Sequence, residues 1–280
     1  MSLQEINISI MTAKDIPFAK SLTDYENWGY LESDFRRLLA NGPEGCFVAW
    51  VEKNPVAIIT STAYEDYAFV GTLIVKPDHR NKKIGERLLV HTMEHLERTG
   101  VATIELDGVF GAVPLYRRLG FKDKYLSLRL FRPGRAEAVA ADSLAPDPDR
   151  AVLEFDRQRT GLNRTSLLQR YLDEFKDSIY THHDEQLSAF AVVRPKETGY
   201  LAIGPCVAEN RNAAEQLLND IVERYAHKSL SLGVPETNWE IVELLLRRGF
   251  VFTQPSLRMY RGRKRNYERH VFAILSPEKG

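Results

Sequence analysis

The chain has 280 residues, of which 44% are hydrophobic and 27% charged, as in ordinary soluble globular proteins. This length fits about two domains. The 38 Lys and Arg residues balance 38 Asp and Glu residues, so no overall field attracts nucleic acid or an anionic membrane. Two cysteines are too few for a disulfide framework. Because apolar runs are short and the first residues lack a signal-peptide pattern, we expect a cytoplasmic protein.

Alternating helix and strand patterns fill the first half of the chain. The stretch Thr12-Ala-Lys-Asp15 is typical of a capping box, so a short helix should begin there. Apolar residues at helical spacing predict longer helices over residues 32–40, 84–98 and 113–119. Runs of β-branched and aromatic residues predict strands over residues 46–51, 56–64, 69–75, 101–106 and 126–131.

The composition changes after these elements. Residues 136–149 are rich in alanine, aspartate and proline, which is typical of a linker between domains. We therefore predict a first domain over residues 1–134, a linker over 135–148 and a second domain over 149–280.

The second half repeats the first. Residues 115–132 and 244–261 share a Gly-Phe pair followed by Ser-Leu-Arg, at an offset of 129 residues. Upstream, Val75 and Val207 match at an offset of 132 residues. The register changes once, by three residues, at the loop within 75–88. We infer two copies of one fold, the second of which lacks this loop.

The loop between the strand 69–75 and the helix 84–98 is strongly basic. It carries Arg80, Lys82 and Lys83 and leads into a helix whose first N–H groups have no partner in the helix. This arrangement is typical of an anion site, and a diphosphate suits it well. Tyr116, on the later helix, offers a phenol. The alternative is a solvated basic helix start without a ligand.

Residues 12–132 resemble the GNAT acetyltransferase superfamily. The stretch Arg80-Asn-Lys-Lys-Ile-Gly85 is similar to the family's Arg/Gln-x-x-Gly-x-Gly/Ala loop, and Leu115-Tyr-Arg-Arg-Leu-Gly-Phe121 is similar to its aromatic-led helix. Residues 149–280 resemble the degenerate second domain of some tandem members. The resemblance implies an α/β fold (an α+β mixed sheet) of two tandem GNAT-like domains, each with a central mixed β-sheet flanked by helices.

The resemblance also implies an activity. We expect an acetyl-CoA-dependent N-acetyltransferase that moves an acetyl group to a primary amine of a small molecule by direct attack in a ternary complex. Acetyl-CoA would be the co-substrate; we expect no metal, no nucleic acid and no membrane partner, and we allow for a homodimer. Two alternatives stay open: a protein or peptide N-acetyltransferase, and a non-catalytic acyl-CoA-binding regulatory module.

The family pattern assigns roles to individual residues. Tyr116 would be the general acid for the leaving thiolate. A general base is suggested by position alone: Asp107 at the end of the strand before that helix, or Glu65 or Asp66 on the turn before the strand 69–75. Trp28, Tyr30 and Glu65 would contact the acceptor. The residues expected to bind the cofactor lie on the strand end, the loop and the first helical turn: Leu73, Ile74, Val75, Arg80, Asn81, Lys82, Lys83, Ile84, Gly85 and Glu86.

Two positions depart from the family pattern. Lys83 stands where the family usually has glycine, and Val109 stands where many members have asparagine. The second half has Asn238 at the latter position but Leu245 in place of the tyrosine. Other signals have simpler interpretations: a turn for residues 182–184, a solvated loop for the basic run 261–265, and core positions for both cysteines.

Overall fold

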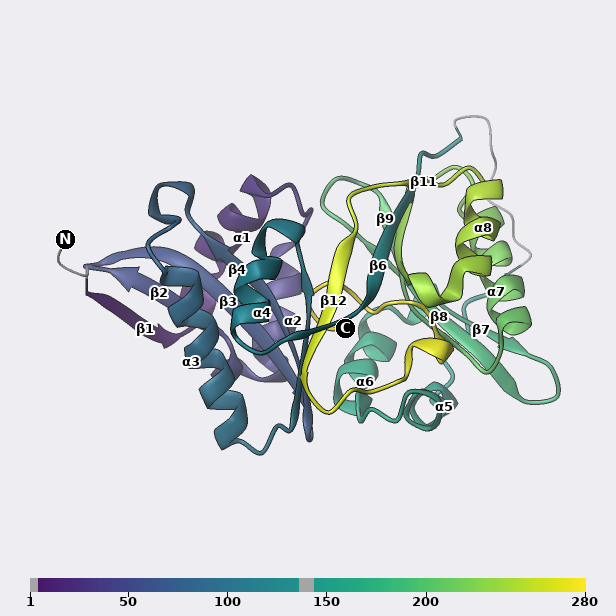
Figure 1. Ribbon diagram of the computed structural model, residues 1–280. Coiled ribbons are helices and arrows are strands. Elements are labelled where there is room, and N and C mark those ends of the chain that lie inside the picture. Colours follow the sequence, from purple (N-terminus) through teal and green to yellow (C-terminus); the bar gives the residue numbers. More distant parts are fainter. Residues whose placement is uncertain (1–4, 136–143) are drawn as a thin grey trace.

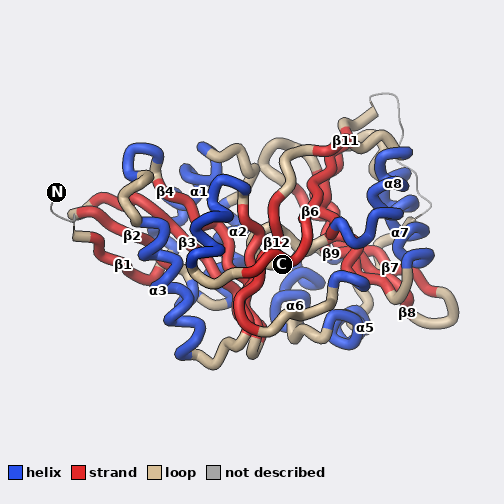
Figure 2. The backbone as a smooth tube through the Cα atoms, viewed as in Figure 1, coloured by secondary structure: helices blue, strands red, loops and turns tan. Residues whose placement is uncertain are grey.

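The structure, a computed structural model, describes residues 5–135 and 144–280. The two halves of the chain lie side by side, and one mixed sheet runs through both (Figures 1 and 2). This confirms the predicted fold class. Most of the predicted linker, residues 136–143, lies outside the described residues.

The elements of the first half follow the predicted order. The helices are α1 (Ile16–Tyr25), α2 (Glu32–Asn41), α3 (Ile84–Arg98) and α4 (Val113–Arg118). The strands are β1 (Ile6–Ile10), β2 (Phe47–Val51), β3 (Asn54–Tyr64), β4 (Tyr67–Val75), β5 (Thr103–Gly108) and β6 (Lys122–Arg132). The capping box is confirmed, because the Thr12 N–H donates to Asp15 Oδ2 at 2.7 Å. Strand β1 was not predicted.

The second half has corresponding elements. Its helices are α5 (Ala151–Thr160), α6 (Thr165–Glu174), α7 (Arg211–Arg224) and α8 (Trp239–Arg247). Its strands are β7 (Ile179–His183), β8 (Leu187–Pro195), β9 (Leu201–Ala208), β10 (Leu230–Pro235), β11 (Val251–Phe252), β12 (Ser256–Gly262) and β13 (Val271–Ala273).

The two halves exchange strands at the centre of the sheet. The strand order is β1-β2-β3-β4-β5-β12-β6-β10-β9-β8-β7, so β12 lies between β5 and β6, and β6 lies between β12 and β10. Ser127 and Ser256, which match in the repeat, face each other in the β6–β12 ladder. We expected a separate sheet for each half. The halves instead form one sheet, because β12 of the second half pairs with β5 and β6 of the first, and β6 also pairs with β10 of the second.

Helices cover both faces of the first half. Leu88, Leu89 and the rest of the apolar face of α3 pack on one side of the sheet, and α1 and α2 pack on the other through a cluster around Phe35. A third cluster joins the halves, because Phe69 of β4 packs with Tyr171 of α6. No helix in the described part of the chain is long and apolar enough to cross a membrane.

Candidate functional site

The parallel strands β4 and β5 diverge near the middle of the first half. Their pairing ends at Val70 and Leu106, although β4 continues to Val75 and β5 to Gly108. Among the described residues, no strand enters the space between the diverging ends. The backbone of residues 73–75 therefore borders this space without a strand partner on that side.

A bulge in β4 produces the divergence. The register between β3 and β4 shifts at this level, and Thr72 adopts a left-handed φ of 44°. A β-branched residue in this region is an outlier, and such strain costs about 1–3 kcal/mol. The hydroxyl of Thr72 lies 2.7 Å from the hydroxyl of buried Thr60, and this hydrogen bond holds the bulge in place.

The loop before α3 presents a row of unpaired N–H groups. Asn81 and Lys83 both have φ 61°, and the first backbone bond of the helix runs from the N–H of Arg87 to the carbonyl of Lys83. The N–H groups of residues 81–86 donate to no described residue. Alternating left- and right-handed residues that lead into a helix make a concave, positively polarised surface that suits an anion.

The cationic side chains of this loop have different surroundings. Arg80 donates to the Val75 carbonyl at 3.0 Å and pairs with Glu26, so it fixes the loop against the end of β4. Lys82 donates to the Asp78 carbonyl at 2.9 Å. Lys83 is exposed and has no ion pair with any described residue. Lys83 thus supplies an available positive charge beside the N–H row, and Arg87 in the first turn of α3 is likewise exposed.

The corresponding region of the second half is closed. The side chain of Asn210 accepts from the Ala213 N–H at 3.0 Å and so caps the start of α7. Strand β13 pairs with β9, and the Ile274 N–H donates to the Gly233 carbonyl of β10 at 2.8 Å. The chain itself therefore fills the space between β9 and β10 that stays open between β4 and β5.

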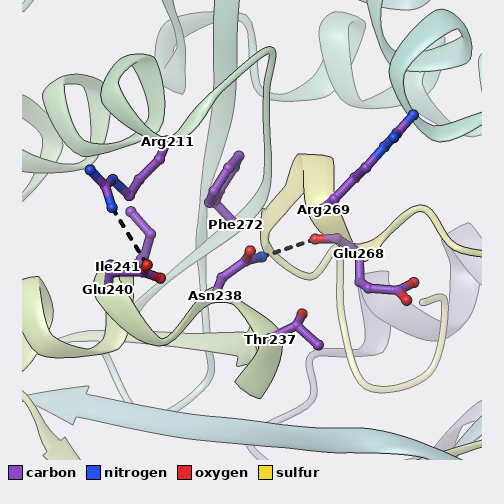
Figure 3. A pocket seen from close by; sticks show the side chains of 8 residues that line it. All are labelled: Arg211, Thr237, Asn238, Glu240, Ile241, Glu268, Arg269 and Phe272. Carbon is purple, nitrogen blue, oxygen red and sulfur yellow. Dashed lines mark hydrogen bonds and ion pairs between the residues drawn. The ribbon is translucent and has the colours of Figure 1, made fainter.

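A pocket of about 470 Å³ lies at the mouth of this closed region (Figure 3). The Asn238 amide donates to the carbonyls of Glu268 and Val271, each at 2.9 Å, and Arg211 lies 3.5 Å from Glu240. Asn238 thus holds the segment leading into β13. Its side-chain amide is therefore engaged in hydrogen bonds that stabilise the second half.

Tyr116 lies in α4 with its ring against the end of β5. The side chain is buried, and its ring packs edge-on against Phe121 at a centroid distance of 6.1 Å. The hydroxyl makes no hydrogen bond with any described residue and is not among the fully enclosed polar atoms. Burial raises the pKa of Tyr116 to about 12, so the phenol keeps its proton at neutral pH. It is available as a donor.

Asp107 lies in a buried ion-pair network. Its Oδ1 accepts from Arg258 Nε at 2.7 Å and its Oδ2 from Arg129 at 2.8 Å. Burial raises the pKa of Asp107, but the two guanidinium charges outweigh this effect and hold the pKa below its ordinary value. An ionised carboxylate with both oxygens paired is a weak base. The geometry therefore favours a structural role, in which Asp107 ties β5 to β12 and β6.

The structure brings together two of the three predicted acceptor residues. The rings of Trp28 and Tyr30 lie 6.3 Å apart on the segment between α1 and α2. Glu65 lies in the turn before β4 and accepts from Asn163 at 2.6 Å. A strand rises about 3.3 Å per residue, so Glu65 is on the order of 20 Å from the bulge at Thr72. It does not adjoin the rest of the site.

Three side chains of the second half adjoin this site and were not predicted. Lys196 Nζ lies 4.4 Å from the centroid of the Tyr30 ring. Glu278 and Lys279 are buried near the end of the described chain, where Glu278 passes close to Gly71. The apolar run over residues 271–275 indicates a buried segment, but no pattern in the sequence connects it to the first half.

The remaining sequence signals have structural roles. His182 lies 3.6 Å from Asp184, and the described residues contain no group that could hold a metal. Both cysteines are buried and unpaired. The basic run 261–265, expected as a solvated loop, is partly engaged: Arg261 and Arg265 pair with acidic residues of the first half.

Comparisons with known families match both halves of the chain. A model described as "Acetyltransferase (GNAT) family" matches residues 16–121, and one described as "Acetyltransferase (GNAT) domain" matches residues 152–273. Together they account for most of the chain, in the order in which the repeat places the two copies.

Characterised relatives cover the chain to different extents. A protein of Pseudoalteromonas sp. (strain SANK 73390) named holothin acyltransferase is 26% identical over 262 residues, which is 91% of this chain and 88% of that protein. The [ribosomal protein bS18]-alanine N-acetyltransferase of Escherichia coli is 32% identical over 79 residues, which is 26% of this chain and 53% of that protein.

Solved structures share the two-domain fold. A putative acetyltransferase from Pyrococcus horikoshii superposes with a TM-score of 0.82 at 24% identity, covering 100% of this chain and 98% of its own. A GCN5-related N-acetyltransferase from Sphaerobacter thermophilus gives a TM-score of 0.65 at 13% identity, covering 92% of this chain and 95% of its own. At these identities the likeness concerns the fold.

Proposed function

The chain belongs to the GNAT acetyltransferases in both of its halves, and on this premise we propose that the first half transfers an acetyl group from acetyl-CoA to a primary amine of a small molecule. The observation that carries the proposal is the contrast between the halves. The first half has an open N–H row, an open space between diverging strands and a buried phenol. In the second half Asn210 caps the helix, β13 fills the space and Leu245 replaces the phenol.

The N–H row suits the diphosphate of coenzyme A. The N–H groups of residues 81–86 would hold its oxygens, and the side chains of Lys82 and Lys83 would offset its charge. The backbone of residues 73–75 would accompany the pantetheine arm along the open side of β4. The thioester would then lie near the bulge at Thr72.

The transfer itself needs a neutral amine and a stabilised thiolate. The amine nitrogen attacks the carbonyl carbon, the C–N bond forms, and the C–S electron pair leaves with sulfur. A backbone N–H near Ile74 would polarise the carbonyl. Tyr116 would donate a hydrogen bond to the departing sulfur. Because its pKa of about 12 exceeds the value of about 8.5 for an ordinary thiol, Tyr116 would stabilise the thiolate mainly as a donor.

In this proposal Asp107 is a structural residue and not the general base that its position in the sequence suggested. Its carboxylate is committed to Arg258 and Arg129, so we propose that it supports the site and that the acceptor loses its proton to solvent. Direct attack fits the residues present, because both thiols are buried and burial raises the pKa of Cys46 to about 11 and of Cys206 to about 12.

The second half favours a small acceptor over a peptide. Its β8–β9 hairpin contacts the α1–α2 segment, and the chain end at Glu278 lies across β4. A peptide acceptor needs an open groove on this side, whereas these two segments narrow the approach.

Thiol release from acetyl-CoA, measured across a panel of amines, tests the proposal together with calorimetry for binding of coenzyme A. We expect Tyr116→Phe to lower kcat by about 100-fold or more while leaving the affinity for coenzyme A unchanged. Tyr260→Phe, which removes a phenol from β12, is the matched control. Binding without turnover of any amine would favour the regulatory alternative, and turnover of peptide amines alone would favour the protein N-acetyltransferase. An absence of coenzyme A binding would overturn the proposal.

A further inference from the structure

The second half forms one wall beside the acceptor side of the first. The Glu197 N–H at the tip of the β8–β9 hairpin donates to the Gly29 carbonyl at 3.3 Å, and the Glu197 carboxylate pairs with Lys20 of α1. The Tyr200 hydroxyl would lie 3.2 Å from a Cβ built on Gly29. These contacts fix the hairpin against the segment that carries Trp28 and Tyr30.

Lys196 is the cation that this hairpin brings to the site. Its ammonium lies over the ring of Tyr30, yet it makes neither a hydrogen bond nor an ion pair with any described residue. Burial lowers the pKa of Lys196, although the charges of Glu278 and Asp34 oppose this effect. By contrast, Lys20 and Lys279 each contact a carboxylate directly.

The segment around Glu278 forms another boundary of this site. A Cβ on Gly71 would lie 2.5 Å from the Glu278 Cα, so Glu278 crosses β4 one residue before the bulge at Thr72. Burial, and next the charge of Glu278, raise the pKa of Tyr30. The contacts thus run from Lys196 to Tyr30, to Glu278 and on to the bulge.

We propose that Lys196 binds a carboxylate of the acceptor, so that the acceptor is a primary amine that also carries an acidic group. This inference rests on the function proposed above. An ammonium that is partly withdrawn from water and has no direct anionic partner lacks the interactions that normally offset burial. A carboxylate on the acceptor would supply charge-assisted hydrogen bonds. The cation–π contact with Tyr30 orients the ammonium for this role.

Matched pairs of amines that differ in one group test the proposal. Phenylalanine is compared with phenylalaninamide, and 4-aminobutyrate with 4-aminobutyramide, by acetyl transfer and by calorimetric binding to the coenzyme A complex. We expect the acid of at least one pair to exceed its amide about tenfold or more in kcat/KM or in affinity, the effect of one charge-assisted hydrogen bond. A panel in which no acid exceeds its amide would overturn the proposal.

Three variants assign the preference to Lys196. Lys196→Gln should reduce the acid-to-amide ratio to within about twofold of one. Lys196→Arg should retain most of the ratio. Lys228→Gln removes an exposed lysine of the same half and should change nothing. A ratio that survives in Lys196→Gln would contradict the role of Lys196.

The outcomes also separate this inference from the proposed function. If all variants bind coenzyme A and acetylate amines without preferring acids, the acetyl transfer stands and only the role of Lys196 fails. If the wild-type protein does not bind coenzyme A, the proposed function fails first.

Discussion

Gly108 and Tyr116 are in such close contact that any side chain at position 108 would displace the Tyr116 ring. A Cβ built on Gly108 would lie 2.9 Å from Tyr116 Cε2 and 3.0 Å from Cδ2. Gly108 is the last residue of β5 and Tyr116 lies in α4, so this contact sets how closely the phenol approaches the space between β4 and β5.

We expect Gly108→Ala to displace the Tyr116 ring and to lower kcat by about tenfold or more, because a small misplacement of a reacting group is costly. The affinity for coenzyme A should stay within about twofold, since the N–H row lies on another segment. Steady-state kinetics and calorimetry measure the two effects. Gly111→Ala is the matched control, because a Cβ at Gly111 would meet no atom within 4 Å. Equal activity of the two variants would contradict the proposed role of Tyr116.

Most helices and strands of the first half were predicted correctly, because their positions follow from the spacing of apolar residues and from turn residues close by in the sequence. Helix α3 occupies residues 84–98, as the spacing of its apolar residues indicated. Lys83 stands where the family usually has glycine, and it adopts the left-handed conformation that glycine takes most easily. The family pattern therefore marked a position with left-handed backbone conformation, although Lys83 replaces the usual glycine there.

The strand exchange could not be predicted in the same way. The stretches Ser127–Arg132 and Ser256–Arg261 have nearly the same pattern, and each of Arg129 and Arg258 contacts Asp107. Periodicity shows that both stretches are strands, but it does not show which neighbour each one pairs with. Lys196 and Glu278 lie beside Tyr30 and Gly71 of the first half only because the two halves are joined in this way. Their place near the site was therefore not predicted either.

Lys83→Gly should have a larger free energy of unfolding than Lys83→Ala. The left-handed conformation costs an ordinary residue about 1–2 kcal/mol, whereas glycine adopts it readily but loses about 0.5–1 kcal/mol through its freer unfolded chain. Lys83→Gly should therefore be about 0.5–1 kcal/mol more stable than Lys83→Ala in urea unfolding. Both variants lose the same charge.

The same pair of substitutions at Lys82 provides the control. Lys82 does not have a positive φ, so Lys82→Gly should be less stable than Lys82→Ala. If glycine and alanine rank in the same order at both positions, the left-handed conformation of Lys83 is not maintained in solution.

Asp107→Asn should destabilise the protein more than it affects the chemical step. Arg258 is fully buried, and loss of the Asp107 charge leaves it with Glu105, 3.5 Å away and shared with Lys124, so its charge is only partly compensated at a cost on the order of 3 kcal/mol. Asp123→Asn is the control, because Asp123 pairs with exposed Arg117. If Asp107 were the general base, Asp107→Asn would instead lower kcat strongly and leave the urea midpoint close to that of the wild type.

Asp107 also contributes to the pH dependence of stability. Its pKa is lower in the folded than in the unfolded protein, so its stabilisation is present above the unfolded value of about 3.9 and is lost as the pH falls below it. The unfolding free energy of Asp107→Asn should therefore decline less steeply in acid than that of the wild type. Urea titrations between neutral pH and pH 3 measure the difference.

The separated halves should not form stable folded proteins on their own. In a fragment of residues 1–134, β5 and β6 lose β12 from between them, and the buried carboxylates of Glu105 and Asp107 lose Arg258. A fragment of residues 149–280 likewise loses β6 from between β10 and β12. We expect each fragment alone to aggregate, since unpaired edges and unpaired buried charges both disfavour the native fold.

Coexpression of the two fragments supplies the missing strands in trans. We expect a one-to-one complex that copurifies through a tag on either fragment and that binds coenzyme A with the affinity of the intact chain. Arg258→Ala in the second fragment should abolish copurification, because this residue joins β12 to both acidic side chains of β5. A first fragment that is monomeric, cooperatively folded and active by itself would show that β12 is dispensable to the first half.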